Sequence, residues 1–221
     1  MTSEPASQDS LLDPIEDIIT AVRGGEMVLV VDDEDRENEG DLIMAAECVT
    51  PEAINFMIRE GRGLVCVGMP EAALSRLGLA PVPQLGKTGG RFATAFTQSV
   101  DGIEGVSTGI SASDRAETIR LLADLDASPE GLASPGHVFP IQADAAGVLG
   151  RPGHTEAASD LAALAGYSPV GVLCEVLLDD GNMARLADLR AMADRFNLKL
   201  GSVAQLVQYR AAHAPAEASD G

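Results

Sequence analysis

The stretch MVLVVDDEDRENEGD, from Met27 to Asp41, joins an apolar run directly to a cluster of acidic residues. Its first part, Met27–Val31, is short and rich in valine, which is typical of a buried strand. The segment Asp32–Asp41 that follows holds seven carboxylates in ten residues. Functional sites in α/β folds are often built where a strand ends, because the sheet supports the loops there. The stretch therefore predicts a buried strand that leads into a candidate site.

The acidic segment Asp32–Asp41 has two interpretations that the residues alone leave open. Runs of charge are usually solvated surface loops. A dense carboxylate cluster also repels itself, however, and a bound hard cation relieves that repulsion. The spacing does not fit an EF-hand loop, because the glycine and the last glutamate stand at the wrong positions. The segment is thus either a divalent-cation site or a solvated loop.

The composition indicates which cellular compartment and which binding partners to expect for this chain. The chain of 221 residues carries a formal net charge of −19, from 34 acidic and 15 basic residues. Such a charge repels nucleic acid and anionic membranes, so we expect neither as a partner. The three cysteines (Cys48, Cys66 and Cys174) form no CxxC pair, which is typical of reduced thiols in a cytoplasmic protein. We also expect no membrane span and no signal peptide, because no apolar run is long enough and the first residues are polar.

Strand and helix patterns roughly alternate along the chain, which favours helices on both faces of one sheet. We expect a single domain at 11–213, with flexible tails at 1–10 and 214–221 and a mobile Gly/Pro-rich loop at 79–92. Predicted strands cover Met27–Val31, Leu64–Val67, Ala93–Val100, Val138–Ala143 and Val170–Leu177. Predicted helices begin near Asp13, Thr50, Pro70, Ser111 or Ser113, Thr155, Leu186 and Ser202.

Four of these helix starts carry capping signals, and one of them is Ser111 or Ser113 before the helix over Ala116–Leu125. Asp13 is predicted as an N-cap before Pro14, with Glu16 closing a capping box. Thr155 is predicted to cap the helix that follows it. Ser202, with glutamine three residues later, predicts a capping box for the last helix.

Three further residues are candidates for chemistry. His154 follows Arg151 and two glycines at a predicted helix start, which together form a plausible anion pocket, although a lone histidine there is equally compatible with a cap. His137 precedes a strand and could equally be structural. Glu175 interrupts the apolar run Val170–Leu177, where it is either solvent-facing by alternation or a partly desolvated acid–base group. The strand pattern alone favours the solvent-facing interpretation of Glu175.

Ordered motifs along nearly the whole chain closely resemble the 3,4-dihydroxy-2-butanone 4-phosphate synthase family of riboflavin biosynthesis. They keep their order within the stretch from about Ile15 to Arg210. The chain shows no GTP cyclohydrolase II module, which is often fused to this family, so it resembles the single-function form. The motifs are VDDEDRENEGDLIMAAE (Val31–Glu47), GLVCVGM (Gly63–Met69), TAFTQSVD (Thr94–Asp101), EGVSTGISASDR (Glu104–Arg115), SPGHVFPIQA (Ser134–Ala143), RPGHTEAASDLAALAG (Arg151–Gly166) and PVGVLCEVLLDDGNMAR (Pro169–Arg185).

The resemblance implies a lyase that converts D-ribulose 5-phosphate into formate and L-3,4-dihydroxy-2-butanone 4-phosphate. It implies Mg²⁺ as the cofactor, with Mn²⁺ as a substitute and two ions in each site. The implied fold is α/β (α+β), a three-layer α/β/α sandwich around a mixed, twisted sheet. The implied assembly is a homodimer with its sites near the interface.

The resemblance also implies residue roles. Metal ligands are expected at Glu37 and His154. Catalytic roles are expected for Glu175, His137, Asp41, Glu39 and Cys66. Substrate contacts are expected from Arg36, Glu37, Asp41, Thr108, Arg151, Pro152, Gly153, His154, Thr155 and Glu175.

Two other functions compete with the lyase. A metal-dependent sugar-phosphate isomerase would share substrate and metal but release no formate. A non-catalytic acidic metal-binding domain would explain Asp32–Asp41 but not Arg151, His154 and Glu175 together.

Overall fold

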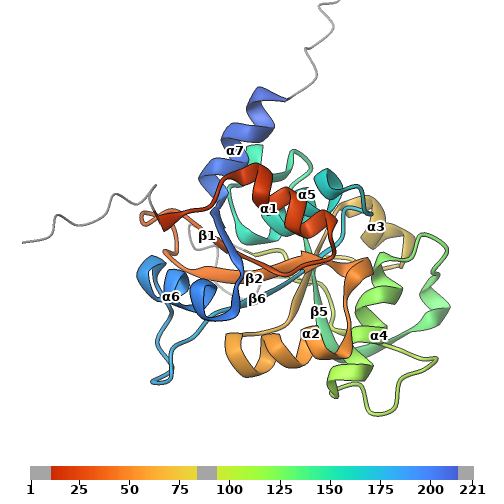
Figure 1. Cartoon of the computed structure of the whole chain (residues 1–221). Helices are drawn as coiled ribbons and strands as arrows, with labels where there is room; N and C mark the ends of the chain where they lie inside the picture. Colours follow the sequence, from red (N-terminus) through yellow and green to blue (C-terminus); the bar gives the residue numbers. More distant parts are fainter. Residues whose placement is uncertain (1–10, 84–93, 214–221) are drawn as a thin grey trace, which may run out of the picture.

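A mixed sheet of seven strands forms the centre of the molecule in the computed structural model, which describes residues 11–83 and 94–213 (Figure 1). The strand order is β4-β5-β3-β6-β2-β1-β7. Neighbours β1–β7 and β3–β5 run parallel, and the other four neighbouring pairs run antiparallel. The strands are β1 (Val28–Val31), β2 (Gly40–Ala45), β3 (Cys66–Met69), β4 (Val100–Gly102), β5 (Leu132–Gln142), β6 (Gly171–Glu175) and β7 (Lys199–Ser202).

Helices cover both faces of this sheet, so the predicted three-layer sandwich is confirmed (Figure 1). One layer holds α1 (Ile15–Arg23), α5 (His154–Ala165) and α7 (Val203–Ala212). The opposite layer holds α2 (Pro51–Phe56), α3 (Glu71–Arg76), α4 (Ala112–Ala123) and α6 (Leu186–Phe196). Shorter turns are the 3-10 turns η2 (Ala46–Cys48), η4 (Pro129–Gly131) and η5 (Gly147–Leu149), and the π-helical turn η3 (Met57–Gly61).

The position of β1 in the sheet explains why its sequence is apolar without interruption. Its side chains point to alternate faces of the sheet. Val28 and Val30 pack in the core beneath α1 and α5, while Leu29 and Val31 pack in the core on the opposite face. A strand buried on both faces needs no polar side chain. The predicted strand at Met27–Val31 is therefore confirmed, one residue shorter at its start.

Each of the predicted helices is present, although α1 starts one residue later than predicted and α5 starts earlier. Ser202 and its partner Gln205 form the predicted capping box of α7. Asp13 is not an N-cap, because α1 begins at Ile15 after Pro14 and has no side-chain cap. The Asp13 carboxylate instead accepts hydrogen bonds from the Leu200 N–H and from Arg190, which tie this segment to β7.

The cap of α5 also differs from the prediction. The helix begins at His154, with Gly153 as its N-cap residue and no side-chain cap, so Thr155 lies inside the first turn. Thr155 is buried and lines a cavity. Because Gly153 has no side chain to cap the helix, the first N–H groups of α5 are available to other acceptors.

The strand predicted at Ala93–Val100 is wrong. Its described residues form only isolated bridges, Phe96 with Ile141 and Thr97 with Pro81, and regular pairing begins at Val100. Thr97 donates its N–H to the Pro140 carbonyl, but Pro140 has no N–H to return. A proline in the neighbouring strand thus interrupts the ladder that the alternation predicted.

Some predictions fall outside the described residues: both tails, and 84–92 of the predicted 79–92 loop. Among the described residues, none of the helices has the length and apolar character needed to cross a membrane.

Helix α5 lies very close to the sheet at two glycines. A Cβ added to Gly171 would lie 2.3 Å from the Ala158 carbonyl oxygen, and one added to Gly68 would lie 2.5 Å from the Thr155 carbonyl oxygen. Both contacts are with backbone, which cannot rotate aside as a side chain can. These glycines therefore set the height at which α5, and His154 at its start, sits above the sheet.

Gly171→Ala should consequently lower the free energy of unfolding by about 1–3 kcal/mol, the usual cost of overpacking. Urea unfolding of the purified variant measures this loss. Gly131→Ala is the matched control, because its Cβ would meet nothing nearer than Leu121 Cδ2 at 3.6 Å. Equal unfolding midpoints for both variants and the wild type would contradict the close approach of α5.

Candidate active site

The acidic loop after β1 is folded around the Asp32 carboxylate. The Asp32 side chain is fully shielded from solvent and accepts hydrogen bonds from the N–H groups of Glu39 (2.8 Å) and Glu37 (3.2 Å). It also accepts one from Arg36 Nη1 at 2.7 Å. Charge-assisted bonds of this kind stabilise a buried carboxylate. The loop is thus ordered around Asp32, which lies in the predicted segment but was given no role of its own, while Asp33, Glu34 and Asp35 remain exposed.

Asp32 and Glu37 meet His154 at the start of α5. Each residue offers one ligand atom, and the three atoms lie within 4.8 Å of one another. The His154 Nε2 atom is buried and has no hydrogen-bond partner among the described residues. Burial lowers the pKa of His154 below the ordinary histidine value, so the ring is neutral and able to bind a metal. Two carboxylates and a neutral imidazole fit a divalent cation.

Asp41 and Glu175 face each other across the pair β2–β6. The Asp41 side chain is buried, and its Oδ1 lies 3.6 Å from His154 Nδ1, too far for a hydrogen bond. Burial raises the pKa of Asp41 well above the ordinary aspartate value, and the facing Glu175 carboxylate raises it further. Glu175 accepts a hydrogen bond from the Leu64 N–H at 2.8 Å. The pair is therefore suited to holding and transferring a proton.

A small cavity of about 170 Å³ is lined by Glu37, Asp41, His154 and Glu175 together with other residues. Burial, and then the Glu175 and Asp41 carboxylates, raise the pKa of the Cys66 thiol strongly, so Cys66 is a neutral thiol here. Burial and the Glu37 carboxylate raise the pKa of Glu39. The lining residues are Arg36, Glu37, Glu39, Asp41, Cys66, Thr94, Phe96, Ile141, Arg151, His154, Thr155, Leu173 and Glu175.

Two arginines converge above the start of α5. A Cβ added to Gly153 would lie 2.8 Å from Arg151 Nη1 and 2.9 Å from Arg36 Nη2, so this N-cap position leaves room for both guanidinium groups. Arg151 is held by Glu156, whose Oε2 lies 2.8 Å from Arg151 Nη1. Two arginines beside the N-terminus of a helix are suited to binding an anion such as a phosphate.

Glu156 was not predicted as a site residue. It is fully buried, and its other oxygen accepts the Asp144 N–H at 3.0 Å. The sequence offers one signal that could have found it. A glutamate in the first turn of a helix, five positions after an arginine, can reach back to that arginine.

Two predicted residues lie elsewhere in the chain. His137 is on β5, where its Nδ1 lies 2.7 Å from Asp101 Oδ2, and Thr108 is on the exposed loop before α4. Neither lines the cavity that holds Glu37 and Glu175. The fold therefore divides the predicted site into two groups within one chain.

Pro152 lines a neighbouring cavity. This cavity has a volume of about 570 Å³ and shares Arg36 and Arg151 with the smaller one. The two cavities thus adjoin at Arg36 and Arg151.

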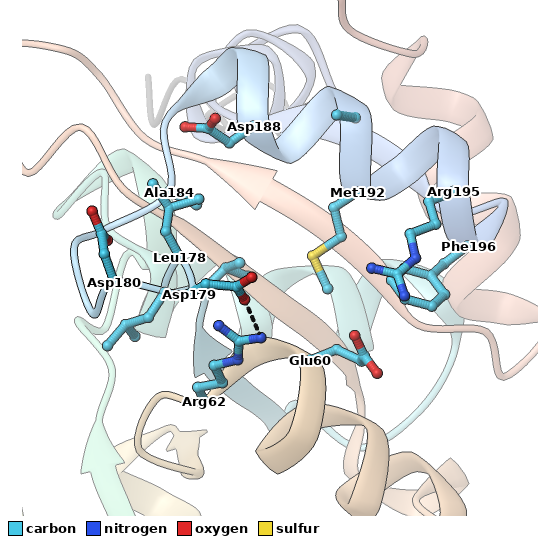
Figure 2. A pocket seen from close by; sticks show the side chains of 13 residues that line it. Glu60, Arg62, Leu178, Asp179, Asp180, Ala184, Asp188, Met192, Arg195 and Phe196 are labelled. Carbon is cyan, nitrogen blue, oxygen red and sulfur yellow. Dashed lines mark ion pairs between the residues drawn. The ribbon is translucent and has the colours of Figure 1, made fainter.

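A further cavity of about 560 Å³ lies between η3 and α6 (Figure 2). Arg62 and Asp179 form an ion pair there at 2.6 Å. None of the predicted site residues lines this cavity. Convergent polar groups identify a site better than volume does, so the cavity between Glu37 and Glu175 is the candidate active site.

The fold and this cavity together define an α/β protein with carboxylates and an imidazole placed as for a hard cation, beside two arginines. Residues 16–209 match the family described as 3,4-dihydroxy-2-butanone 4-phosphate synthase. The chain belongs to that family. This confirms the resemblance that the sequence motifs predicted.

Individual relatives agree with the family match. Riboflavin biosynthesis protein RibBA from Cytophaga hutchinsonii is 56% identical over 203 residues, covering 91% of this chain and 50% of that protein. The 3,4-dihydroxy-2-butanone 4-phosphate synthase of Pseudomonas aeruginosa is 52% identical over 202 residues, covering 91% of this chain and 55% of that protein. The chain spans about half the length of these curated relatives. A solved 3,4-dihydroxy-2-butanone 4-phosphate synthase in complex with two magnesium ions is 39% identical, with a TM-score of 0.86 over 91% of this chain and 98% of that one.

Replacement of Asp41 tests the electrostatics of the pair with Glu175. A raised folded-state pKa means that the folded chain binds more protons than the unfolded one above about pH 4, so ionisation of Asp41 costs stability as the pH rises. In metal-free protein at pH 7.5, Asp41→Asn should raise the unfolding midpoint by at least about 2 °C. The gain should shrink towards pH 4.5.

Differential scanning fluorimetry in EDTA measures this change. Asp35→Asn removes the same charge from an exposed position on the same loop and should leave the midpoint unchanged. A gain of equal size in both variants would mean that relief of the overall net charge, rather than burial of Asp41, is the cause.

Proposed function

We propose that this chain converts D-ribulose 5-phosphate into L-3,4-dihydroxy-2-butanone 4-phosphate and formate, as a step of riboflavin biosynthesis. One observation carries the proposal: the possible cation ligands Glu37 and His154 line the same cavity as the arginines Arg36 and Arg151, with Asp32 close to both ligands. A phosphosugar presents both features, a phosphate for the arginines and vicinal oxygens for a hard cation. Family membership supports the same reaction.

The metal ligands in this proposal are Glu37 and His154, with Asp32 beside them. Mg²⁺ bound there would stabilise negative charge on the sugar oxygens as a Lewis acid. The relative solved with two magnesium ions supports two ions in each site. The mixed carboxylate and imidazole set also suits Mn²⁺, which we propose as a substitute.

Proton transfers fall to the carboxylates that face each other across β2 and β6. Asp41 keeps a proton more readily than an ordinary aspartate, so the pair with Glu175 can carry one proton between substrate atoms. Glu39 lines the same cavity and is a third proton carrier. The neutral thiol of Cys66 shapes the cavity wall rather than acting as a thiolate nucleophile.

Arg36 and Arg151 bind the phosphate in this proposal, beside the N–H groups of the first turn of α5, which include that of Thr155. Gly153 lets both guanidinium groups lie against the start of α5, and Pro152 borders the adjoining cavity. Glu156 holds Arg151 in place. The protein needs such local cations because its net charge of −19 disfavours an anionic substrate elsewhere on its surface.

The working unit is proposed to be a cytoplasmic homodimer in which His137 and Thr108 of one chain complete the site of the other. His137 and Thr108 are both exposed, and neither of them lines the cavity. Ile103 and Ile110, close to Thr108 in the sequence, are each 54% exposed. Large apolar side chains gathered in one exposed loop region favour contact with a second chain.

Substitution separates metal binding from chemistry. Glu37→Gln or His154→Ala should abolish both Mg²⁺ binding and turnover, because each removes a ligand. Glu175→Gln is the matched comparison. It should retain metal and substrate binding yet lose several orders of magnitude in kcat, because its interaction is made mainly in the transition state.

Calorimetric titration of Mg²⁺ and a formate assay with ribulose 5-phosphate labelled at C4 make these measurements. The wild type should release one labelled formate for each sugar consumed and lose activity in EDTA until Mg²⁺ is restored. Label that stays in a sugar product would point to an isomerase, and no consumption at all would point to a binding domain.

Heterodimers test the shared site. His137→Gln and Glu37→Gln should each be inactive as homodimers. Co-expressed with different tags and purified as a heterodimer, they should give about half of the wild-type turnover, because one of the two sites then contains both native residues. A heterodimer as inactive as its parents, or a particle mass near the 22.9 kDa of one chain, would contradict the proposal.

A further inference from the structure

His137 is held by two hydrogen bonds to one carboxylate. Asp101, on the neighbouring strand β4, accepts the His137 backbone N–H on Oδ1 at 2.9 Å, and its Oδ2 lies 2.7 Å from the ring atom Nδ1. The His137 side chain is 44% exposed and that of Asp101 only 14%. The carboxylate is thus shielded while the imidazole remains accessible.

The pairing of β4 with β5 is built around this contact. The register shifts between Val100, which pairs with Val138, and Asp101, which pairs with Ala133. The extra residues of β5 between these two pairs include His137. A β-bulge of this kind re-aims a side chain, here towards Asp101.

The loop before α4 covers the same contact. Gly109 has φ +90°, and a Cβ there would lie 2.1 Å from Asp101 Oδ2 and 2.6 Å from His137 Nδ1. The loop backbone therefore passes directly over the hydrogen bond, with Thr108 beside it. The buried Asp114 fixes this loop by accepting the Gly109 N–H at 3.0 Å and the Ser107 hydroxyl at 2.8 Å.

A carboxylate on Nδ1 determines which ring nitrogen carries the proton. An ionised carboxylate only accepts, so Nδ1 must donate and Nε2 of the neutral ring is left as a proton acceptor. When Nε2 takes a proton from a substrate, the positive charge forms beside the carboxylate and is stabilised there until the proton is returned. The backbone hydrogen bond orients the carboxylate, and the bond to Nδ1 then fixes the direction of the ring.

We propose that Asp101 is a positioning residue that holds His137 with its proton on Nδ1, so that Nε2 is the accepting atom in proton transfer. This inference rests on the proposed function, in which His137 contacts the substrate in the partner's site. Asp101 itself touches His137 and the covering loop, so its effect on the reaction passes through the imidazole.

Asp101→Asn tests the inference with little change in shape. The asparagine oxygen can still accept the His137 backbone N–H, but its NH₂ group would donate to Nδ1 and move the ring proton to Nε2. Long-range ¹H–¹⁵N spectra of the full-length protein report the tautomer of each of the three histidines, with His137 assigned by its loss in His137→Gln. We expect the Nδ1–H form in the wild type and the Nε2–H form in the variant.

Kinetics complete the test. Asp101→Asn should lower kcat by about 10²–10⁴-fold with KM within threefold, because the wrong tautomer disables proton transfer rather than binding. Asp101→Glu should recover part of the lost kcat and should restore the Nδ1–H form of His137. Glu104→Gln removes an exposed carboxylate from the same loop and should stay within twofold of the wild type.

A kcat of Asp101→Asn equal to that of the wild type would overturn the inference. An Nε2–H tautomer of His137 in the wild type would overturn it as well. The second measurement uses the wild type alone and so does not depend on whether the variant folds. Both results leave the lyase assignment intact if the wild type releases formate. If the wild type releases none while the tautomer switches as expected, the proposed function fails and the orientation of His137 by Asp101 stands.

Discussion

Repulsion among carboxylates at one end of the sheet is the constraint on which the site depends. Glu37, Asp41 and Glu175 come from a loop and two strands, yet they line one small cavity. Such repulsion is stronger in a partly buried place than in water. Arg36 offsets the charges of the adjoining Asp32 and of Glu37, two N–H groups offset Asp32 as well, and burial raises the pKa of Asp41, which favours its uncharged form. The remaining charge is what a divalent cation would neutralise, so the site's electrostatics and its proposed cofactor follow from one arrangement.

Helix α5 joins the candidate cation ligands to the side of the cavity that carries Arg36 and Arg151. Its first residue, His154, faces Asp32 and Glu37, and its N-cap glycine leaves room for Arg36 and Arg151. The helix can do both because backbone contacts at two sheet glycines fix its height. The contact between Asp101 and His137 does not line this cavity, and the proposed homodimer is what would bring the two groups together in one site.

Local signals predicted the elements well where the local residues also decide the structure. The capping box at Ser202 closes within one turn, and α6 begins at the predicted Leu186, because both depend on residues only a few positions apart. The failures have long-range causes. Asp13 bonds to β7 instead of capping α1, and Pro140 in β5 interrupts the ladder expected for Ala93–Val100. A local pattern contains no information about a partner far along the chain.

The sequence by itself determined that a buried strand leads into an acidic loop and that a helix start carries a histidine and an arginine, because strand alternation and helix capping act over a few residues. Its motifs also identified the family. Only the tertiary structure decided that Glu175 faces Asp41, that Asp32 lies beside His154, and that Glu156 holds Arg151. Strand register and helix packing bring these groups together, and both depend on contacts between distant segments that burial of the two cores selects as a whole.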